Sequence, residues 1–209
     1  MKVISFISPC YNEEKVIDEY WSRVSKVADL YPQYCFEFVV VNDGSQDKSP
    51  MILDEIARRD KRLKVVHLAA NVGHQIALFA GIEAARGDIN ITIDIDLQDP
   101  PELLEQFLLK INEGYQVVHG QRTSRDGETV FKLMTAKAYY RILSITSSTS
   151  LVRDCADFRA FTKEVREVII RYQEKHKYLR GIFAIIGFEQ TVIQYERQSR
   201  YAGETKYSL

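Results

Sequence analysis

Short runs of apolar residues alternate with helical patterns through the first half of the chain. Five runs rich in β-branched and aromatic residues predict strands at residues 3–8, 36–41, 63–68, 89–93 and 117–120. After each of the first four runs, apolar residues recur three and four positions apart, which predicts a helix. Nearly all-apolar strands that alternate with helices indicate a mostly parallel sheet covered on both faces. We therefore expect an α/β fold.

The second half of the chain has a different pattern. Apolar residues from 131 to about 144 keep helical spacing, with a basic flank that fits either packing on the sheet or a membrane surface. The Ser/Thr-rich residues 144–150 predict a loop, residues 163–172 a further helix, and residues 188–195 a strand. Neither an internal repeat nor a linker divides the chain, so we expect a single domain over residues 1–209.

Polar loops follow the first, second and fourth predicted strands. In open parallel sheets, ligands bind outside the carboxyl ends of the strands. These loops carry Asn12, Asp43, Asp94 and Asp96. We therefore expect these four side chains to lie along one rim of the sheet.

The most informative pair in these loops is Asp94 and Asp96. Residues two apart in an extended chain point to the same side, so both carboxylates can hold one hard cation and leave positions for diphosphate oxygens. Gln98, at the same spacing, can add a neutral oxygen ligand. A solvated acidic loop is the alternative, but the place of the pair at the end of a buried strand favours a metal site.

Two other carboxylates have more than one interpretation. Asp43 precedes a glycine and so favours a tight turn, but at the end of a strand it can also accept a hydrogen bond from a nucleobase. Asp157 lies among apolar and aromatic residues, where it can act as a general base or orient an acceptor. A structural ion pair with Arg153 or Arg159 explains Asp157 equally well, and the local sequence leaves these alternatives open.

Basic residues gather in three later segments, which start at Arg122, Arg171 and Arg197. Most basic residues simply face solvent. In a chain with an acidic metal site before them, however, such clusters could bind a second anion besides the one that the metal holds. A diphosphate would then lie on the metal and another phosphate on the arginines.

Composition excludes several other classes of protein. The 209 residues are 45% hydrophobic and 27% charged with a net charge of −1, which gives no overall attraction to nucleic acid. The three cysteines lie far apart, so we expect a reducing compartment and neither a disulfide framework nor a zinc site. The sequence has no P-loop, GxGxxG, GxSxG or paired-histidine motif, and no apolar run of the ~18 residues that a membrane span needs.

Segments along essentially the whole chain resemble a known family. Residues 8–14 (SPCYNEE), 41–45 (VNDGS), 71–73 (NVG) with Gly81, and 94–102 (DIDLQDPPE) are similar to the family 2 glycosyltransferases of the GT-A fold. The segments that resemble the polyprenyl-phosphate subgroup are 120–122 (GQR), 156–159 (ADFR), 178–181 (YLRG), 186–188 (IGF), 195–197 (YER) and 200–207 (RYAGETKY). This subgroup includes the bactoprenol glucosyltransferases and the dolichol-phosphate mannose synthases.

The resemblance implies a Rossmann-like GT-A sheet, with a nucleotide-sugar-binding half at residues 1–120 and a smaller acceptor-binding half at residues 121–209. It implies an inverting hexosyl transfer from a nucleotide-sugar to a polyprenyl phosphate, with Mg²⁺ or Mn²⁺ as cofactor. The later motifs are more like the glucosyl enzymes, which favours UDP-glucose over GDP-mannose and UDP-N-acetylglucosamine.

The resemblance also assigns roles to individual residues. Those that would border the nucleoside are Pro9, Tyr11, Glu13 and Asp43. Those that would bind the metal are Asp96 and Gln98, with Asp94 at the metal or the ribose. Those that would meet phosphates are Arg122, Arg200 and Lys206. Asp157 would face the acceptor as the candidate base, although a phosphate nucleophile is already ionised and would need orientation more than deprotonation.

The chain departs from the family pattern at two places. Asn42 stands where the family usually has a first Asp, but Asp43 remains, so nucleotide binding should survive. Such enzymes often continue into transmembrane helices, whereas this chain ends at Leu209. Either the native protein is a soluble variant or this chain is a fragment of it. The abrupt end favours a fragment that is soluble by itself, that lacks a native C-terminal membrane segment and that acts at the cytosolic face of a membrane.

Three other functions stay open at this point. A GT-A enzyme with a sugar hydroxyl as acceptor would need Asp157 as a true base and would not need the late arginines. The intact set of Asp94, Asp96, Gln98 and Asp157 argues against a catalytically silent module that binds a nucleotide-sugar or a lipid. A nucleotidyltransferase would need a basic, Gly-rich loop where residues 9–14 are acidic. The oligomeric state is also open, and a homo-oligomer is one alternative.

Overall fold

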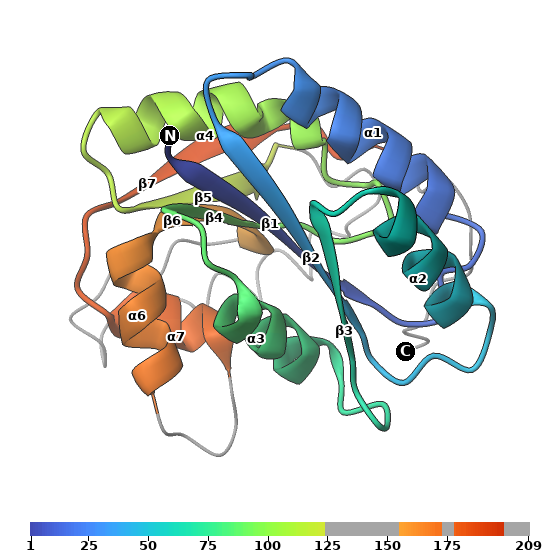
Figure 1. Cartoon of the computed structure of the whole chain (residues 1–209). Coiled ribbons are helices and arrows are strands. Elements are labelled where there is room, and N and C mark those ends of the chain that lie inside the picture. The colour runs from blue at the N-terminus through green and yellow to red at the C-terminus, as the bar shows by residue number, and fades with distance from the viewer. Residues whose placement is uncertain (124–154, 173–177, 199–209) are drawn as a thin grey trace.

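A seven-stranded mixed sheet runs through the part of the chain that the structure, a computed structural model, describes: residues 1–123, 155–172 and 178–198. The strand order is β3-β2-β1-β4-β6-β5-β7 (Figure 1). The strands are β1 Val3–Cys10, β2 Cys35–Asn42, β3 Leu63–His67, β4 Ile89–Thr92, β5 Val117–Arg122, β6 Cys155–Thr162 and β7 Gln190–Tyr195. β6 is antiparallel to both of its neighbours, and the other pairs are parallel.

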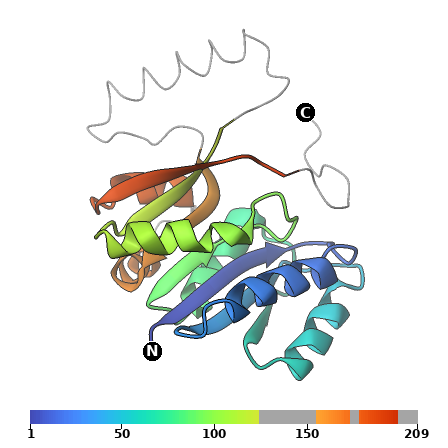
Figure 2. The same cartoon turned by 90° about the horizontal axis from the view of Figure 1, so that it is seen from above.

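Helices cover both faces of this sheet. They are α1 Ile17–Asp29, α2 Ser49–Arg59, α3 His74–Ala84, α4 Leu104–Asn112, α6 Lys163–Arg171 and α7 Leu179–Ile185, with a 3₁₀ turn, η1, at Pro101–Leu103. The buried residues of α1, α2 and α4 form one core with one face of the strands, and those of α3, α6 and α7 form a second core with the other face. In Figure 1, α1 and α4 lie above the sheet and α3, α6 and α7 below it, and Figure 2 shows the first group from above.

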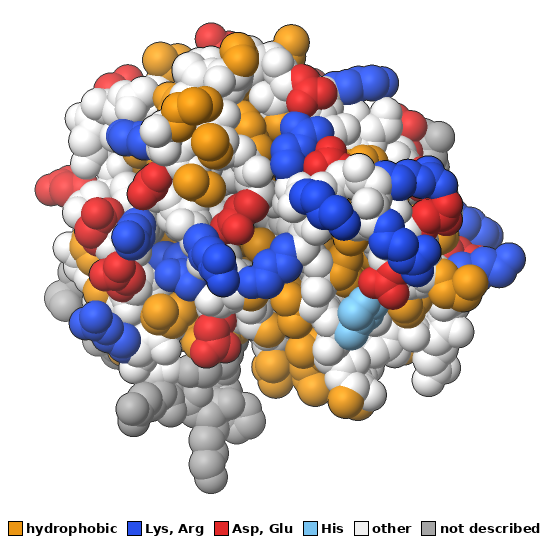
Figure 3. Space-filling view, in the orientation of Figure 1, with side chains coloured by type: hydrophobic (Ala, Val, Ile, Leu, Met, Phe, Trp, Pro, Cys, Tyr) orange, Lys and Arg blue, Asp and Glu red, His pale blue; other side chains and the backbone are white. Residues whose placement is uncertain are grey.

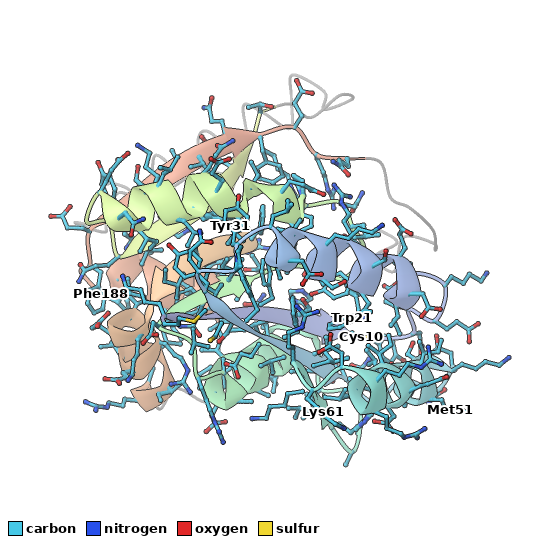
Figure 4. All side chains as sticks on the ribbon, turned by 45° about the horizontal axis from the view of Figure 1, so that its top comes forward. Cys10, Trp21, Tyr31, Met51, Lys61 and Phe188 are labelled. Atoms are coloured by element: carbon cyan, nitrogen blue, oxygen red, sulfur yellow. The ribbon has the colours of Figure 1, made fainter. Side chains whose placement is uncertain are left out.

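Alternation along the inner strands builds both cores. Phe38 of β2 belongs to the first core and its neighbour Val39 to the second, because successive residues of a strand point to opposite faces. Phe38 stacks on Phe6 of β1 with ring centroids 5.6 Å apart and meets Trp21 of α1 edge-on at 5.0 Å. Figure 4 labels Trp21. Each such fully buried apolar side chain contributes about 1.5–3 kcal/mol. The sheet is therefore a rigid apolar scaffold for the loops at its edges.

Most of the expected elements form. All five predicted strands are present, the strand-like run at 188–195 is β7, and the helix predicted near 163–172 is α6. The helix predicted at 131–144 and the loop at 144–150 lie outside the described residues. The division of the domain into two halves after residue 120 stays a prediction.

Two elements were not predicted. β6 carries Asp157 and Arg159 at positions that are 7% and 2% exposed, so buried charges interrupt its apolar pattern. It enters the sheet between β4 and β5 and runs against both, which makes the sheet mixed. α7 is only seven residues long, about two turns, and its short apolar run has no clear helical period.

The surface agrees with the balanced composition of the chain. On the face drawn in Figure 3, acidic and basic side chains are interspersed, in keeping with the net charge of −1. Within residues 1–123, 155–172 and 178–198, no helix has both the length and the apolar character needed to cross a bilayer.

A buried histidine lies in β5. His119 is 4% exposed, and its Nε2 donates a hydrogen bond to Gln190 Oε1 of β7 at 2.7 Å. Its Nδ1 has no hydrogen-bond partner among the described residues, and the ring packs edge-on against Phe183 of α7. Burial, aided by the charge of nearby Arg159, lowers the pKa of His119 to about 4. The folded chain therefore keeps this ring neutral.

We expect His119 to make the fold sensitive to acid. The unfolded chain protonates this histidine near pH 6.5 and the folded chain near pH 4, so the free energy of unfolding should fall as the pH drops between these values. The loss due to this residue should reach about 3 kcal/mol. Urea unfolding of His119→Gln and of the wild type across this range measures it, because the variant should lack that part of the slope.

Ile4→Val is the control for this measurement. It loosens the core at β1, away from His119, so it should lower stability at every pH and keep the slope. A slope in His119→Gln equal to that of the wild type would contradict the prediction.

Candidate active site

A cleft of about 730 Å³ opens at the carboxyl ends of β1, β2 and β4. Its wall contains the four polar residues expected along one rim, Asn12, Asp43, Asp94 and Asp96. The cleft is also lined by Pro9, Tyr11, Glu13 and Gln98, which were predicted to contact the nucleotide or the metal. Parallel strands end at the same edge of the sheet, which is why residues from distant parts of the sequence meet here.

Asp43 stabilises one wall of this cleft by hydrogen bonds to the backbone. It is 3% exposed, and its two oxygens accept hydrogen bonds from the amides of Val72 at 2.8 Å and Gly73 at 3.0 Å. The next residue, Gly44, has a φ of +64°, and a Cβ there would lie 2.5 Å from the carbonyl carbon of Ala70. The turn after β2 therefore packs directly against the loop before α3. Each carboxylate oxygen has two lone pairs, so these two amides leave Asp43 with capacity for a further donor.

Asp94 and Asp96 project from the loop after β4. Ile95 and Leu97, which alternate with them, are each 3% exposed and belong to the core, so the two carboxylates face the cleft. Asp96 is 7% exposed, and its Oδ1 accepts the amide of Gln98 at 3.1 Å. Leu97 has a φ of +61°, a left-handed backbone that residues other than glycine rarely adopt. This residue turns the chain between Asp96 and Gln98.

The oxygens of this loop suit a hard divalent cation, because Mg²⁺ and Mn²⁺ prefer carboxylate and amide oxygens. In the described part of the chain, no group of three or more His, Cys, Asp and Glu side chains could hold a metal ion by itself. Asp94 and Asp96 offer two carboxylates to such a cation, and Gln98 lies beside them on the wall of the cleft. The Oε1 of Gln98 accepts a hydrogen bond from Arg197, which also lines the cleft.

His74 and Gln75, the first residues of α3, connect the cleft to Asp157, and neither was predicted from the sequence as a site residue. His74 Nε2 lies 2.8 Å from Asp94 Oδ1, and its Nδ1 lies 3.9 Å from Asp157 Oδ2. Gln75 Nε2 donates to the same Asp157 oxygen at 2.9 Å. Their one signal in the sequence is their position directly after residues 71–73, the loop that Asp43 binds.

The proton on His74 is favoured by its surroundings. Burial lowers the pKa of His74, but the hydrogen bond and the charge of Asp94 outweigh burial, and Asp157 adds to them. The pKa of His74 therefore lies above its ordinary value, and the ring can carry a positive charge between the two carboxylates.

Asp157 is held by two guanidinium groups. Its Oδ1 accepts hydrogen bonds from Arg159 Nη2 at 3.0 Å and Arg180 Nε at 3.2 Å, and its Oδ2 accepts one from Arg180 Nη2 at 3.1 Å. Burial raises the pKa of Asp157, but the charges of Arg159 and Arg180 more than reverse this, so the pKa lies below its usual value. Of the two structural partners considered, Arg159 is in place, and Arg153 lies outside the described residues.

Arg122 is not among the residues that line the cleft. Its Nη2 lies 3.1 Å from Asp99 Oδ1, and its Nε donates to the hydroxyl of Tyr195 at 3.2 Å. That hydroxyl donates to Asp99, which is 1% exposed, at 2.5 Å. The network ties the end of the metal loop to the ends of β5 and β7. The phosphate contact of Arg122 stays a prediction, and Arg200 and Lys206 lie outside the described residues.

Comparison with known sequences identifies related proteins. The profile of the family described as glycosyl transferase family 2 matches residues 5–170. An uncharacterised glycosyltransferase of Bacillus subtilis (strain 168), YkcC, is 44% identical over 205 residues, which cover 98% of this chain and 63% of that protein. The bactoprenol glucosyl transferase of Shigella phage SfV is 33% identical over 205 residues, which cover 98% of this chain and 66% of that protein. The chain thus spans slightly less than two thirds of the length of these relatives.

A solved structure shares the fold. The crystal structure of glucosyl-3-phosphoglycerate synthase from Mycobacterium tuberculosis, in complex with Mn²⁺, UDP and phosphoglyceric acid, matches with a TM-score of 0.61 at 20% sequence identity. The match covers 97% of this chain and 72% of that one. The resemblance noted in the sequence is therefore confirmed: the chain belongs to glycosyl transferase family 2, and its mixed, mostly parallel sheet with helices on both faces is a GT-A fold.

Proposed function

We propose that this chain is the catalytic part of a metal-dependent, inverting glycosyltransferase. The donor is a nucleotide-sugar, with UDP-glucose favoured, and the acceptor is a polyprenyl phosphate at the cytosolic face of a membrane. The observation that carries the proposal is a single cleft with Asp94 and Asp96 on the same wall as Pro9, Tyr11 and Asp43. The name of the phage relative supports the sugar and the lipid. The Mn²⁺ and UDP bound to the mycobacterial synthase support the metal and the nucleotide.

The donor would lie across the carboxyl ends of β1, β2 and β4. Pro9, Tyr11 and Glu13 would border the nucleoside, and Asp43 has the capacity to accept one more hydrogen bond, from a base. The diphosphate would lie toward Asp94 and Asp96. A Mg²⁺ or Mn²⁺ ion bound by these carboxylates, with Gln98 beside them, would act as a Lewis acid that stabilises the leaving nucleoside diphosphate.

The surroundings of Asp157 favour a phosphate acceptor over a sugar hydroxyl. A hydroxyl must lose its proton as it attacks, whereas Asp157 has a lowered pKa and is bound by Arg159 and Arg180. A phosphate oxygen is already ionised near neutral pH. It would attack the anomeric carbon from the face opposite the leaving group, which inverts the configuration. The predicted phosphate contacts Arg200 and Lys206 would reduce the repulsion between acceptor and donor.

Loss of a metal carboxylate should nearly abolish turnover. Asp96→Ala should slow sugar transfer on the order of 10²–10⁴-fold, because the charge of the leaving diphosphate loses its stabilisation. Glu105→Ala removes an exposed carboxylate on α4 and should transfer at the wild-type rate. Nucleoside diphosphate release at increasing Mn²⁺ compares the two, and thermal unfolding checks that both are folded. Near-wild-type turnover by folded Asp96→Ala would refute the metal assignment.

The substrates can be identified by a panel of UDP- and GDP-sugars, with Mg²⁺ or Mn²⁺ and with or without a short polyprenyl phosphate. We expect nucleoside diphosphate release to need both the metal and the lipid phosphate, and to be fastest with UDP-glucose. Release with a free sugar in place of the lipid would support a hydroxyl acceptor. Metal-dependent donor binding without any release would support a silent binding module.

A further inference from the structure

The hydrogen-bonding capacity of Asp157 is filled by the chain itself. A carboxylate offers about four lone-pair sites. Arg159 and Arg180 occupy two on Oδ1, at 3.0 and 3.2 Å. Arg180 and Gln75 occupy two on Oδ2, at 3.1 and 2.9 Å. A donor on the acceptor substrate could reach Asp157 only if one of these bonds broke.

The two guanidinium groups that share Asp157 lie in different surroundings. Arg159 is 2% exposed, stacks 4.3 Å from the ring centroid of Phe183, and pairs with Asp157 inside the protein. The side chain of Arg180 is 52% exposed. Two guanidinium groups and one carboxylate sum to one positive charge, and Arg180 is the member of the group that reaches the surface.

Contacts from α3 fix the place of Arg180. Gln75 accepts the amide of Leu179 with its Oε1 at 3.3 Å and donates to Asp157 with its Nε2. One side chain thus holds both the backbone before Arg180 and the carboxylate that binds its guanidinium. His74, the neighbour of Gln75, lines the donor cleft. Arg180 therefore lies just beyond the donor cleft, on the side of Asp157.

We propose that Arg180 binds the phosphate group of the acceptor, and that Asp157 is a positioning residue that holds the Arg180 guanidinium rather than a general base. This inference rests on the proposed function, since it names the group that recognises the acceptor anion. Two of the five N–H groups of Arg180 bond to Asp157, and the others can serve phosphate oxygens. A guanidinium fixed at this place would also offset the repulsion between acceptor phosphate and donor diphosphate.

Arg180→Gln in the full chain tests the proposal. Binding of a short isoprenyl monophosphate in detergent micelles is titrated with and without UDP, and binding of UDP-glucose is titrated with Mn²⁺. We expect the variant to bind the isoprenyl phosphate about 10–100-fold more weakly, because a charge-assisted hydrogen bond is lost. Its affinity for UDP-glucose should stay within about twofold of the wild type, since Arg180 contacts the acceptor. In turnover, the KM for the lipid phosphate should rise and that for the donor should not.

Two controls define the result. Arg58→Gln removes an exposed charge at the end of α2, outside the basic segments, and should leave both affinities unchanged. The corresponding isoprenyl alcohol lacks the phosphate, so the wild type should bind it more weakly than the phosphate, and Arg180→Gln should show a smaller difference between the two. An unchanged affinity of Arg180→Gln for the phosphate would overturn the proposal. So would an equal loss of UDP-glucose affinity, which would place the guanidinium on the donor diphosphate.

The outcome for Arg180 can be told apart from that of the proposed function. If the wild type binds the isoprenyl phosphate through Arg180 but transfers no sugar to it, the proposed reaction fails and the anion site stands. If sugar is transferred and Arg180→Gln keeps the wild-type KM for the lipid, the reaction stands and the Arg180 proposal fails.

Asp157→Asn separates a positioning residue from a base. If Asp157 is a positioning residue, Asp157→Asn should raise the KM for the lipid phosphate and leave the pH profile of kcat unchanged. Its effect on the KM should not be additive with that of Arg180→Gln. A loss of kcat and of one limb of the pH profile, with the KM unchanged, would identify a base and overturn the proposal. Asp157 also neutralises buried Arg159, so thermal unfolding must show a folded variant. If Asp157→Asn does not fold, Arg180→Gln alone tests the proposal, because the side chain of Arg180 is half-exposed.

Discussion

One buried carboxylate, Asp157, connects three elements of this fold. Its hydrogen bonds to Arg159, Arg180 and Gln75 join β6 to α7 and α3. A buried charge without partners is strongly destabilising, so these guanidinium and amide groups stabilise the fold as well as the site. The hydrogen bond from Gln75 also fixes the first turn of α3, from which His74 reaches Asp94 on the wall of the cleft.

Repulsion between negative groups is the main electrostatic problem of the proposed reaction. Asp94 and Asp96 would meet a diphosphate, and a second phosphate would have to approach the same carbon. Positive charge is available on both sides, because Arg197 lies on the cleft wall and Arg180 lies beside Asp157. Groups that are already fixed by hydrogen bonds need no rearrangement when the reaction occurs. The arrangement thus favours an acceptor that brings its own charge over one that must first be deprotonated.

The apolar strands and the polar loops after them were predictable, because both follow from local patterns and from the geometry of parallel sheets. β6 was not, since Asp157 and Arg159 occupy positions that usually carry apolar residues. Gln75 was missed for another reason: its partner Asp157 lies 82 residues away, and no local pattern encodes that contact. The pairing of Arg122 with Asp99 is of the same kind. Local patterns pointed to polar residues that meet in one cleft, and contacts between distant residues determine how each side chain is held.

The place of β6 has a consequence for how the chain is assembled. β6 lies between β4 and β5 although it follows both in the sequence, so those two strands keep an open edge until residues 155–162 join them. Pairings between distant segments form late and slow the folding of the chain. β6 also carries Asp157, so the strand that joins β4 to β5 is the strand that brings Gln75 and Arg180 together. In a partly folded chain, the loss of this strand pairing and the loss of the proposed anion site would therefore be one and the same defect.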